Sequence, residues 1–304
     1  MKILITGGAG FIGSNIVEHF HRTTDVVVLD SLRSGFEQNL AGFKVQFIRG
    51  SVTEKPVVEE AARGVDYIFH LAALVSVPES MEQPDETVNI NVLGTLNVLD
   101  AARKHRVKKV VISSTAAVYG DNPTVPKVES MLPEPKSPYA ITKLDAEYYA
   151  KMYTAEFMLP VVCLRYFNVF GPRQNPKSQY AAAVPIFIDR AIKNREITIY
   201  GDGEQTRDFI YVKDVVAANV LAAESAAPGV YNVACGRKIT INDLAKTIIA
   251  LTNSSSTIRH VPERAGDVKH SQADISRARA FGFRPCCSLE DGLKATVEFL
   301  ASKQ

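Results

Sequence analysis

The chain has 304 residues, 46% of them hydrophobic and 22% charged, a balance typical of a globular protein with one large domain or two closely packed ones. Its 35 basic and 33 acidic residues are evenly spread and give a net charge of +2, which argues against a nucleic-acid-binding surface. The sequence has neither the layout of a signal peptide nor an apolar run near the roughly 18 residues of a membrane helix, and its four cysteines fit no zinc or disulfide pattern, so we expect a cytoplasmic protein without a metal.

Short apolar runs, each followed by a helix-like stretch, dominate the first part of the chain. They are rich in β-branched residues and apolar on both faces, as strands covered by helices on both sides must be. The runs are 2–7, 25–30, 44–50, 66–73, 108–115 and 160–168. This alternation predicts an α/β fold with a Rossmann-type, doubly wound parallel sheet.

The first run leads directly into a glycine-rich turn, TGGAGFIG at residues 6–13. Gly7, Gly10 and Gly13 have the spacing G-x-x-G-x-x-G, and a helix-like stretch follows. A turn without side chains lets backbone N–H groups and a helix N-terminus approach a pyrophosphate. Strand, turn and helix together predict a dinucleotide-binding site.

The second run ends at Asp30, 17 residues beyond Gly13. A carboxylate at this place can accept hydrogen bonds from both ribose hydroxyls and would repel a 2′-phosphate. This favours NAD over NADP, although the nearby Arg33 could instead attract a phosphate.

Tyr139 and Lys143 lie four residues apart in SPYAITK (137–143), directly behind Pro138. Proline suits the first turn of a helix, so both side chains are expected on one helix face. A phenol is a poor base at neutral pH, but a nearby ammonium and a positively charged nicotinamide favour the phenolate. Thr115 ends the fifth run, at the sheet edge where such folds bind ligands.

The regular alternation stops near residue 170, where a loop rich in proline and polar residues begins. We predict an NAD-binding domain at 1–170 and a smaller α/β substrate domain formed mainly by 171–304. Residues at roughly 210–235 are expected to return to the sheet. Residues 253–260 have the composition of a connector.

Seven motifs in this order make the chain resemble the extended short-chain dehydrogenase/reductase superfamily, and within it the UDP-glucose/UDP-galactose or UDP-N-acetylhexosamine 4-epimerases. The motifs are GGAGFIG (7–13), HLAA (70–73), SSTAAVYG (113–120), SPYAITK (137–143), LRYFNVFGPRQ (164–174), GDGEQTRDFIYVKD (201–214) and RAGDVKHSQADISRA (264–278). The resemblance covers essentially the whole chain. It implies NAD as cofactor, a UDP-hexose as substrate, and three catalytic residues: Thr115, Tyr139 and Lys143.

The resemblance also implies two sets of binding residues. Those for the cofactor are Gly7, Gly10, Phe11, Ile12, Gly13, Asp30, Ser31, Ser34, Gly35, Val52, Leu71, Ala72, Ala73, Asn91, Ser113, Tyr139, Lys143 and Tyr166. Those for the substrate are Ser76, Thr115, Asn168, Ala183, Tyr200, Arg207, Arg264, Asp267 and Ser271.

Several substrate residues have an implied role. Arg207 and Arg264 would neutralise the diphosphate, because a guanidinium donates paired hydrogen bonds to phosphate; either could instead form a surface ion pair. Asn168 would lie near the diphosphate and Asp267 near the ribose. Tyr200 would pack near uracil, or alternatively belong to the core.

The two residues directly behind Thr115 indicate the reaction. Related 4,6-dehydratases carry Asp-Glu directly after the catalytic Thr, and decarboxylating relatives carry a Glu two places on. Here Ala116 and Ala117 stand at these positions and can transfer no proton. Inversion at carbon 4 needs neither group, so we expect an epimerase. A decarboxylase, a reductase or a non-catalytic NAD-sensing protein is the alternative.

Three further features bear on these expectations. Ser271 stands where glucose-restricted relatives carry a bulky tyrosine, so both plain and N-acetylated sugars are expected to fit. Ser51 replaces the aspartate that usually meets the adenine, and Val75 replaces a lysine that some relatives place beside the cofactor. The resemblance also implies a homodimer in which helices at roughly 85–105 and 138–157 pair across a two-fold axis.

Overall fold

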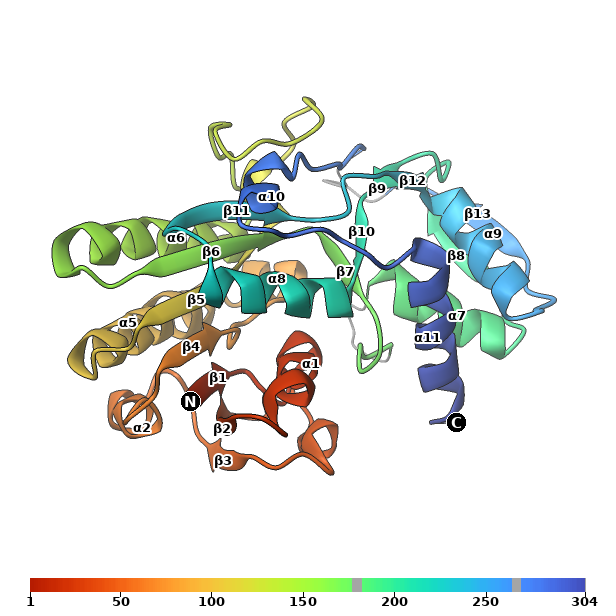
Figure 1. The fold of residues 1–304 in the computed structure, drawn as a ribbon. Coiled ribbons are helices and arrows are strands. Elements are labelled where there is room, and N and C mark those ends of the chain that lie inside the picture. Colours follow the sequence, from red (N-terminus) through yellow and green to blue (C-terminus); the bar gives the residue numbers. More distant parts are fainter. Residues whose placement is uncertain (177–181, 264–268, 304) are drawn as a thin grey trace.

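The computed structural model describes residues 1–176, 182–263 and 269–303, and a seven-stranded sheet lies at its centre (Figure 1). In spatial order the strands are β11 (Gly229–Val233), β6 (Val161–Tyr166), β5 (Lys109–Thr115), β4 (Tyr67–His70), β1 (Lys2–Thr6), β2 (Asp25–Asp30) and β3 (Gln46–Arg49). Each neighbouring pair is parallel. The expected α/β class with a doubly wound parallel sheet is therefore confirmed. The strand order changes direction at β1, the switch point beside which such sheets bind ligands.

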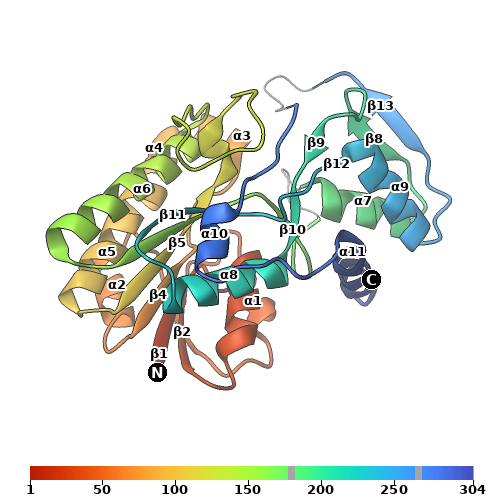
Figure 2. The same ribbon diagram turned by 45° about the horizontal axis from the view of Figure 1, so that its top comes forward.

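Helices cover both faces of this sheet (Figure 2). On one face lie α2 (Lys55–Ala61), α5 (Gly94–Lys104) and α6 (Pro138–Phe157); on the other lie α1 (Phe11–Phe20), α8 (Val212–Glu224) and α10 (Ser276–Ala280). Alternate residues of one strand serve the two cores: Ile3 and Ile5 pack with the α1 side, and Leu4 packs with the α5 side. This double burial explains why the strands are apolar on both faces.

Short helical elements surround the carboxyl ends of the strands. They are η1 (Glu37–Leu40), α3 (Val77–Glu82), α4 (Pro84–Val88), the π-helical η2 (Asn89–Leu93) and η3 (Ala116–Tyr119). The helix expected at 85–105 is thus α4, η2 and α5 in succession, with a π-helical turn in the middle. Such turns often occur at functional sites.

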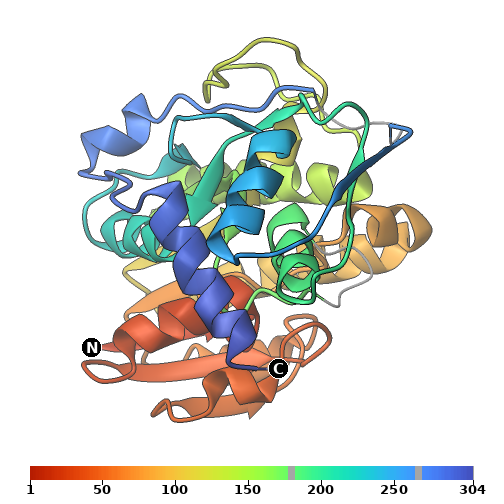
Figure 3. The same ribbon diagram turned by 90° about the vertical axis from the view of Figure 1, so that its right-hand side faces the viewer.

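A second, smaller group of elements lies beside the central sheet (Figure 3) and has its own hydrophobic core. It contains α7 (Ala183–Ile192), α9 (Ile241–Leu251), α11 (Leu289–Ala301) and the parallel pair β8 (Ile197–Tyr200) and β13 (Ile258–Val261). Two small sheets lie beside it: β7 (Asn168–Phe170) with β10 (Phe209–Tyr211), and β9 (Thr206–Arg207) with β12 (Ile239–Thr240).

The chain crosses between the two parts several times. After β10 it forms α8 on the large sheet and β11 at its edge, and later α10 packs beside β11. The expectation that 253–260 is only a connector is wrong at its end, because β13 begins at Ile258 and pairs with β8. In the described part of the chain, no helix combines the length and apolar character needed to span a membrane.

Candidate active site

The glycine-rich turn between β1 and α1 leaves no room for side chains. Gly7 has a φ of +70°, and a Cβ there would lie 2.7 Å from the backbone nitrogen of Ala72. A Cβ on Gly13 would lie 2.2 Å from the carbonyl oxygen of Gly7. Gly10 is the N-cap of α1, which Phe11 and Ile12 open, and no side chain of the described residues caps this helix end. The turn fits the expected pyrophosphate, which would accept from the free N–H groups.

Asp30 ends β2 beside this turn. Its carboxylate accepts hydrogen bonds from the backbone N–H groups of Ala9 (2.9 Å) and Leu32 (2.8 Å). Burial raises the pKa of Asp30, and the two hydrogen bonds oppose that rise. The carboxylate is therefore held next to the glycine-rich turn, which fits its expected role towards ribose hydroxyls.

The loop after β2 is fastened to the glycine-rich turn through Ala9. The carbonyl oxygen of Ala9 accepts from the N–H of Phe36 (3.0 Å) and from the side-chain amide of the buried Asn39 (2.9 Å). The sequence interpretation did not identify Asn39. The loop also carries three residues expected to bind the cofactor: Ser31, Ser34 and Gly35.

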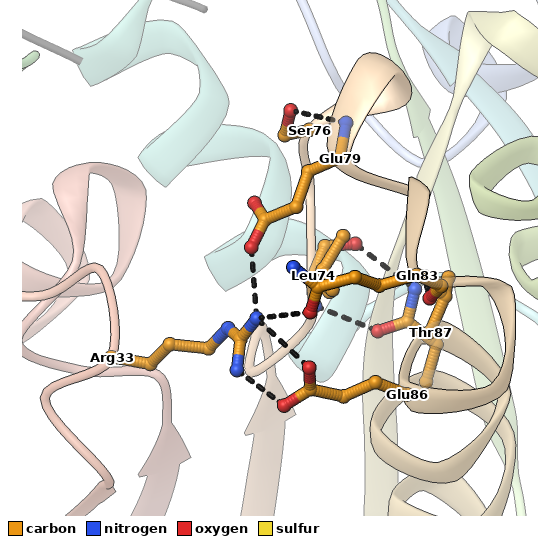
Figure 4. A network of polar contacts seen from close by, with 8 residues as sticks. Arg33, Leu74, Ser76, Glu79, Gln83, Glu86 and Thr87 are labelled. Atoms are coloured by element: carbon orange, nitrogen blue, oxygen red, sulfur yellow. Dashed lines mark hydrogen bonds and ion pairs between the residues drawn. The ribbon is translucent and has the colours of Figure 1, made fainter. Parts of the chain in front are cut away.

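Arg33 of the same loop contacts α3 and α4 (Figure 4). Its Nη2 donates to Glu79 Oε1 (2.8 Å), and its Nη1 donates to Glu86. Because β1 lies between β2 and β4, this contact spans the end of β1, where the glycine-rich turn begins. The two glutamates neutralise the cation that could have attracted a 2′-phosphate, which supports NAD rather than NADP.

A buried chain of hydrogen bonds joins β1, β4 and α5 beside the site. His70 Nε2 lies 3.0 Å from Thr95 Oγ1, whose hydroxyl donates to the carbonyl oxygen of Asn91 (2.5 Å). Nε2 therefore carries the hydrogen, and Nδ1 accepts from Thr6 Oγ1 at 2.7 Å. Thr6 Oγ1 in turn accepts from the N–H of Ala72 (3.3 Å). The chain fixes the segment in which Leu71, Ala72 and Ala73 are expected to face the cofactor.

Asn91, in the π-helical turn, holds the next residue of that segment. Its Oδ1 accepts from the N–H of Leu74 (2.7 Å), and its Nδ2 donates to the carbonyl of Leu74 (3.0 Å) and to Thr142 Oγ1 (3.0 Å). Thr142 lies on α6 between Tyr139 and Lys143. The side chain thus links the expected cofactor segment to the catalytic helix, and direct contact of Asn91 with NAD stays a prediction.

Thr115, Tyr139 and Lys143 come together at the carboxyl end of β5. Ser137 caps α6, its Oγ accepting from Ala140 N (3.2 Å), so the helix begins immediately before Tyr139. Thr115 is close enough to the Tyr139 hydroxyl to lower the pKa of the phenol. Lys143 Nζ donates to the carbonyl oxygen (2.8 Å) and Oγ (3.3 Å) of Ser113. The three residues named from the sequence are therefore neighbours in space.

Burial dominates the ionisation of both catalytic groups. It raises the pKa of Tyr139, and the neighbouring Thr115 side chain works in the opposite direction. Burial lowers the pKa of Lys143 to about 8. The neighbour that favours the phenolate in this structure is Thr115, and a contribution of Lys143 stays a prediction. A cofactor with a positive charge would add to that effect.

Two other expected cofactor residues are buried. Val52 packs against Gly94 at the start of α5, where a Cβ on Gly94 would lie 2.5 Å from Val52 Cγ2. Tyr166 lies in the core on the α8 side, and its hydroxyl donates to Asn219 Oδ1 (2.9 Å). Ser51, in place of the usual aspartate, is hydrogen-bonded to Thr53 Oγ1 at 2.8 Å.

Two expected substrate residues meet on β9. Arg207 lies in this strand, and its Nη1 donates to the carbonyl oxygen of Thr206 (2.9 Å). The same oxygen accepts from the N–H of Ser271 (3.1 Å). The residue expected at the diphosphate and the residue expected at the sugar are therefore held by one backbone segment. Arg264 and Asp267 lie outside the described residues.

The remaining substrate residues come from elements of both parts of the chain. Ser76 caps α3, its Oγ accepting from Glu79 N (3.2 Å), and Ala183 opens α7. Asn168, in β7, donates to the carbonyl oxygen of Asp208 (3.3 Å). Tyr200 ends β8 and is 38% exposed, so it does not belong to the core.

Asp208 is a buried residue that sequence reasoning missed. Its carboxylate accepts from the N–H groups of Cys235 (2.9 Å), Gly236 (3.0 Å) and Ala273 (3.2 Å). Burial raises the pKa of Asp208 to about 6. The available signal in the sequence was an acidic residue, Asp208, directly before the apolar Phe209. Among the described residues, no group of three His, Cys, Asp or Glu side chains is placed to hold a metal ion.

Comparison with known proteins agrees with this geometry. The model of the family described as "NAD dependent epimerase/dehydratase family" matches residues 3–234. A solved UDP-N-acetylglucosamine 4-epimerase from Methanobrevibacter ruminantium has 42% identity and a TM-score of 0.97, covering 100% of this chain and 99% of the other. The UDP-glucose 4-epimerase of Thermus thermophilus, solved with NAD, has 37% identity and a TM-score of 0.92, with 100% of both chains covered.

Sequence relatives include more than one reaction. A putative UDP-glucose 4-epimerase of Methanocaldococcus jannaschii is 36% identical over 301 residues, with 98% of both chains covered. A UDP-N-acetyl-alpha-D-glucosaminuronate decarboxylase of Bacillus cytotoxicus is 35% identical over 315 residues, covering 98% of this chain and 97% of the other.

Proposed function

The chain belongs to the NAD dependent epimerase/dehydratase family, and we propose that it interconverts UDP-hexoses by inversion at carbon 4. The observation that carries the proposal is that Thr115 and Tyr139 are neighbours at the carboxyl end of β5, with two alanines directly after Thr115. Epimerases solved at 37% and 42% identity over the whole chain support it.

Tyr139 would take the proton of the sugar 4-hydroxyl while Thr115 holds that hydroxyl in place. NAD, when bound, would supply the hydride acceptor in its oxidised form and the hydride donor in its reduced form. Tyr139 then returns its proton to the carbonyl oxygen, so atoms and electrons balance without a second substrate. Lys143, hydrogen-bonded to Ser113, would orient the cofactor ribose and stabilise the phenolate.

The positions after Thr115 favour epimerisation over elimination or decarboxylation. Ala116 and Ala117 begin η3, and Ala117 donates its backbone N–H to Thr115 Oγ1 (3.1 Å). Their methyl side chains can neither take the proton beside a new carbonyl nor protonate a departing hydroxyl. Because a decarboxylase is among the sequence relatives, decarboxylation is the alternative reaction.

The sugar specificity follows from Ser271. The backbone N–H of Ser271 donates to the carbonyl oxygen of Thr206, which directly precedes Arg207. A diphosphate bound at Arg207 and a sugar bound at Ser271 would therefore belong to one molecule. A small side chain leaves volume that a tyrosine ring would fill. We therefore propose that plain and N-acetylated UDP-hexoses are both substrates.

The active form is proposed to be a homodimer formed through α6 and the α4–α5 segment. Both present large apolar side chains to solvent, which is a feature of interfaces between subunits. On α6 these are Ile141, Tyr148 and Met152; on the α4–η2 segment they are Val88 and Leu93. Light scattering tests the assembly.

The reaction is tested by incubating the NAD-loaded protein with UDP-glucose and with UDP-N-acetylglucosamine. The expected product has the mass of the substrate and the inverted configuration at carbon 4, seen by NMR of the anomeric proton. Loss of carbon dioxide from UDP-glucuronate, without inversion of either hexose, would favour the decarboxylase. NAD binding without turnover of any UDP-sugar would favour an NAD-sensing protein.

A further inference from the structure

The catalytic helix makes a third contact with β5 that the reaction itself does not use. Tyr139, Lys143 and Glu147 follow one another at intervals of four residues, so they lie on one face of α6. Tyr139 lies next to Thr115, and Lys143 is hydrogen-bonded to Ser113. Glu147 accepts a hydrogen bond from the hydroxyl of the residue between them, Ser114, at 2.5 Å. Three consecutive residues of β5 thus face three successive turns of α6, and two of them are hydrogen-bonded to it.

Glu147 is also one half of a buried ion pair with Arg165 of β6. Arg165 Nε and Nη2 donate to the two carboxylate oxygens at 2.8 and 2.7 Å, a bidentate arrangement with a defined orientation. The side chains are 5% and 4% exposed. The pairing with Glu147 raises the pKa of Arg165 against the effect of burial, so the guanidinium stays charged.

Arg165 extends this contact towards the part of the chain that carries Ser271. Its guanidinium lies 4.8 Å from the ring centroid of Tyr119, whose hydroxyl donates to Asn232 Oδ1 (2.7 Å). Asn232 Nδ2 donates to the carbonyl oxygens of Lys127 (3.0 Å) and Asp274 (3.2 Å). Asp274 stands three residues after Ser271, in the same motif.

A buried ion pair between two elements has a high desolvation cost in free energy. Apolar side chains of similar volume usually give equal or greater stability, because the two charges lose their hydration. Apolar contacts, however, have no direction, whereas a bidentate pair fixes both the rotation and the position of a helix along a strand. Acid/base groups must be held to within about 0.5 Å of the productive geometry.

We propose that Glu147 and Arg165 are positioning residues, which set α6 against β5 so that Tyr139 meets the reacting hydroxyl and link this register to the segment that holds the sugar. The inference rests on the proposed epimerase reaction. That reaction assigns Glu147 and Arg165 no contact with the substrate or the cofactor, and their partners in the structure are Ser114, Tyr119 and each other. Removing the two charged side chains should therefore lower the turnover rate of the enzyme–substrate complex and leave substrate binding largely unchanged.

The test replaces both charges with uncharged side chains of similar length, Glu147→Met with Arg165→Met. The pair lines a pocket of about 400 Å³ between α6 and the edge strand β11, which leaves room for the changed shapes. The matched control is Glu290→Met with Lys294→Met, which removes the exposed ion pair of α11. A third variant, Glu147→Asp, keeps both charges but shortens the carboxylate arm.

Urea unfolding and steady-state kinetics with saturating NAD are measured on all three variants and the unaltered protein. We expect the Met pair to unfold at the same or higher urea concentration while kcat falls at least 10-fold, with KM within about twofold. Glu147→Asp should also lower kcat, and the control should match the unaltered protein. In the Met pair, the limb of the pH–rate profile that reports Tyr139 should move to higher pH, because the phenol is less well placed.

Full kcat in a stable Met pair would overturn the proposal. So would a fall in kcat that only follows a loss of stability, since that describes a purely structural pair. If neither the Met pair nor Glu147→Asp folds, the pair is needed for the fold itself and the proposal is likewise overturned. Absence of epimerisation by the unaltered protein would instead contradict the proposed function.

Discussion

Replacing His70 with glutamine should make the protein less sensitive to acid. His70 is buried between β1 and α5, accepts a hydrogen bond from Thr6 and donates one to Thr95. The bond from Thr6 requires the neutral ring, because a proton on Nδ1 would face the Thr6 donor, whereas Nε2–H donates to Thr95 in either form. Burial, and secondarily the positive charge of Lys143, lowers the pKa of His70 to about 3.

The size of the effect follows from linkage. The folded-state pKa lies below the unfolded value of about 6.5, so the stabilising contribution is fully present above pH 6.5 and is lost as the pH falls towards 3. At pH 4.5 the unfolded chain has gained a proton that the folded protein still excludes. Because pH 4.5 lies two units below the unfolded pKa and each unit is worth about 1.4 kcal/mol, the free energy of unfolding falls by about 3 kcal/mol.

Urea unfolding at pH 7 and pH 4.5 measures this difference. The unaltered protein should lose about 3 kcal/mol more than His70→Gln between the two pH values, since glutamine does not titrate and the carboxylates are common to both proteins. His19→Gln is the control, because His19 is exposed. Equal pH dependence in the unaltered protein and His70→Gln would refute the reasoning.

Three further results are expected. Tyr139→Phe should lower turnover by at least about 100-fold while UDP-sugar still binds, and near-normal rates would exclude Tyr139 as the proton acceptor. Ser271→Tyr should reduce kcat/KM for the N-acetylated sugar by about 10-fold or more, about 1.4 kcal/mol, and spare the plain hexose; equal losses would show that position 271 does not select by size. Light scattering should give twice the chain mass of 33.3 kDa, and a monomer at every concentration would contradict the proposed interface.

The sequence was most informative where local chemistry decides the structure. Each of the six apolar runs became a strand of the central sheet, and all except the exposed to half-buried β3 are buried between two helical layers. The glycine-rich turn was equally clear, since Gly7 and Gly13 stand where a side chain would collide with the backbone. Family membership and NAD dependence, expected from the motifs, are confirmed by the family match.

Contacts between distant parts of the chain were not predictable from one sequence. β13 was missed because its central residues, Arg259 and His260, are exposed and polar, so the strand lacks an apolar pattern. The sequence around Asp208 does not indicate that its carboxylate accepts hydrogen bonds from three backbone N–H groups, because these groups belong to the distant residues 235, 236 and 273. The pairing of Glu147 with Arg165 likewise depends on how α6 packs on β6.

The return of α10 to the sheet was not anticipated either. This helix has only five residues, and Ala278 is the one that packs into the core on the α1 side. A single small apolar residue carries almost no sequence signal. Its place is decided by the neighbouring Phe281 and Phe283, which are buried in the same core.

The central claim is inversion at carbon 4, and anomeric NMR tests it most directly. The NAD-loaded protein is incubated separately with UDP-glucose, UDP-N-acetylglucosamine and UDP-glucuronate. The expected result is a new anomeric signal from the 4-inverted hexose for each of the first two substrates, with unchanged mass and no net reduction of NAD. Decarboxylated product from UDP-glucuronate with both hexoses untouched, or NAD binding with no turnover at all, would contradict the account.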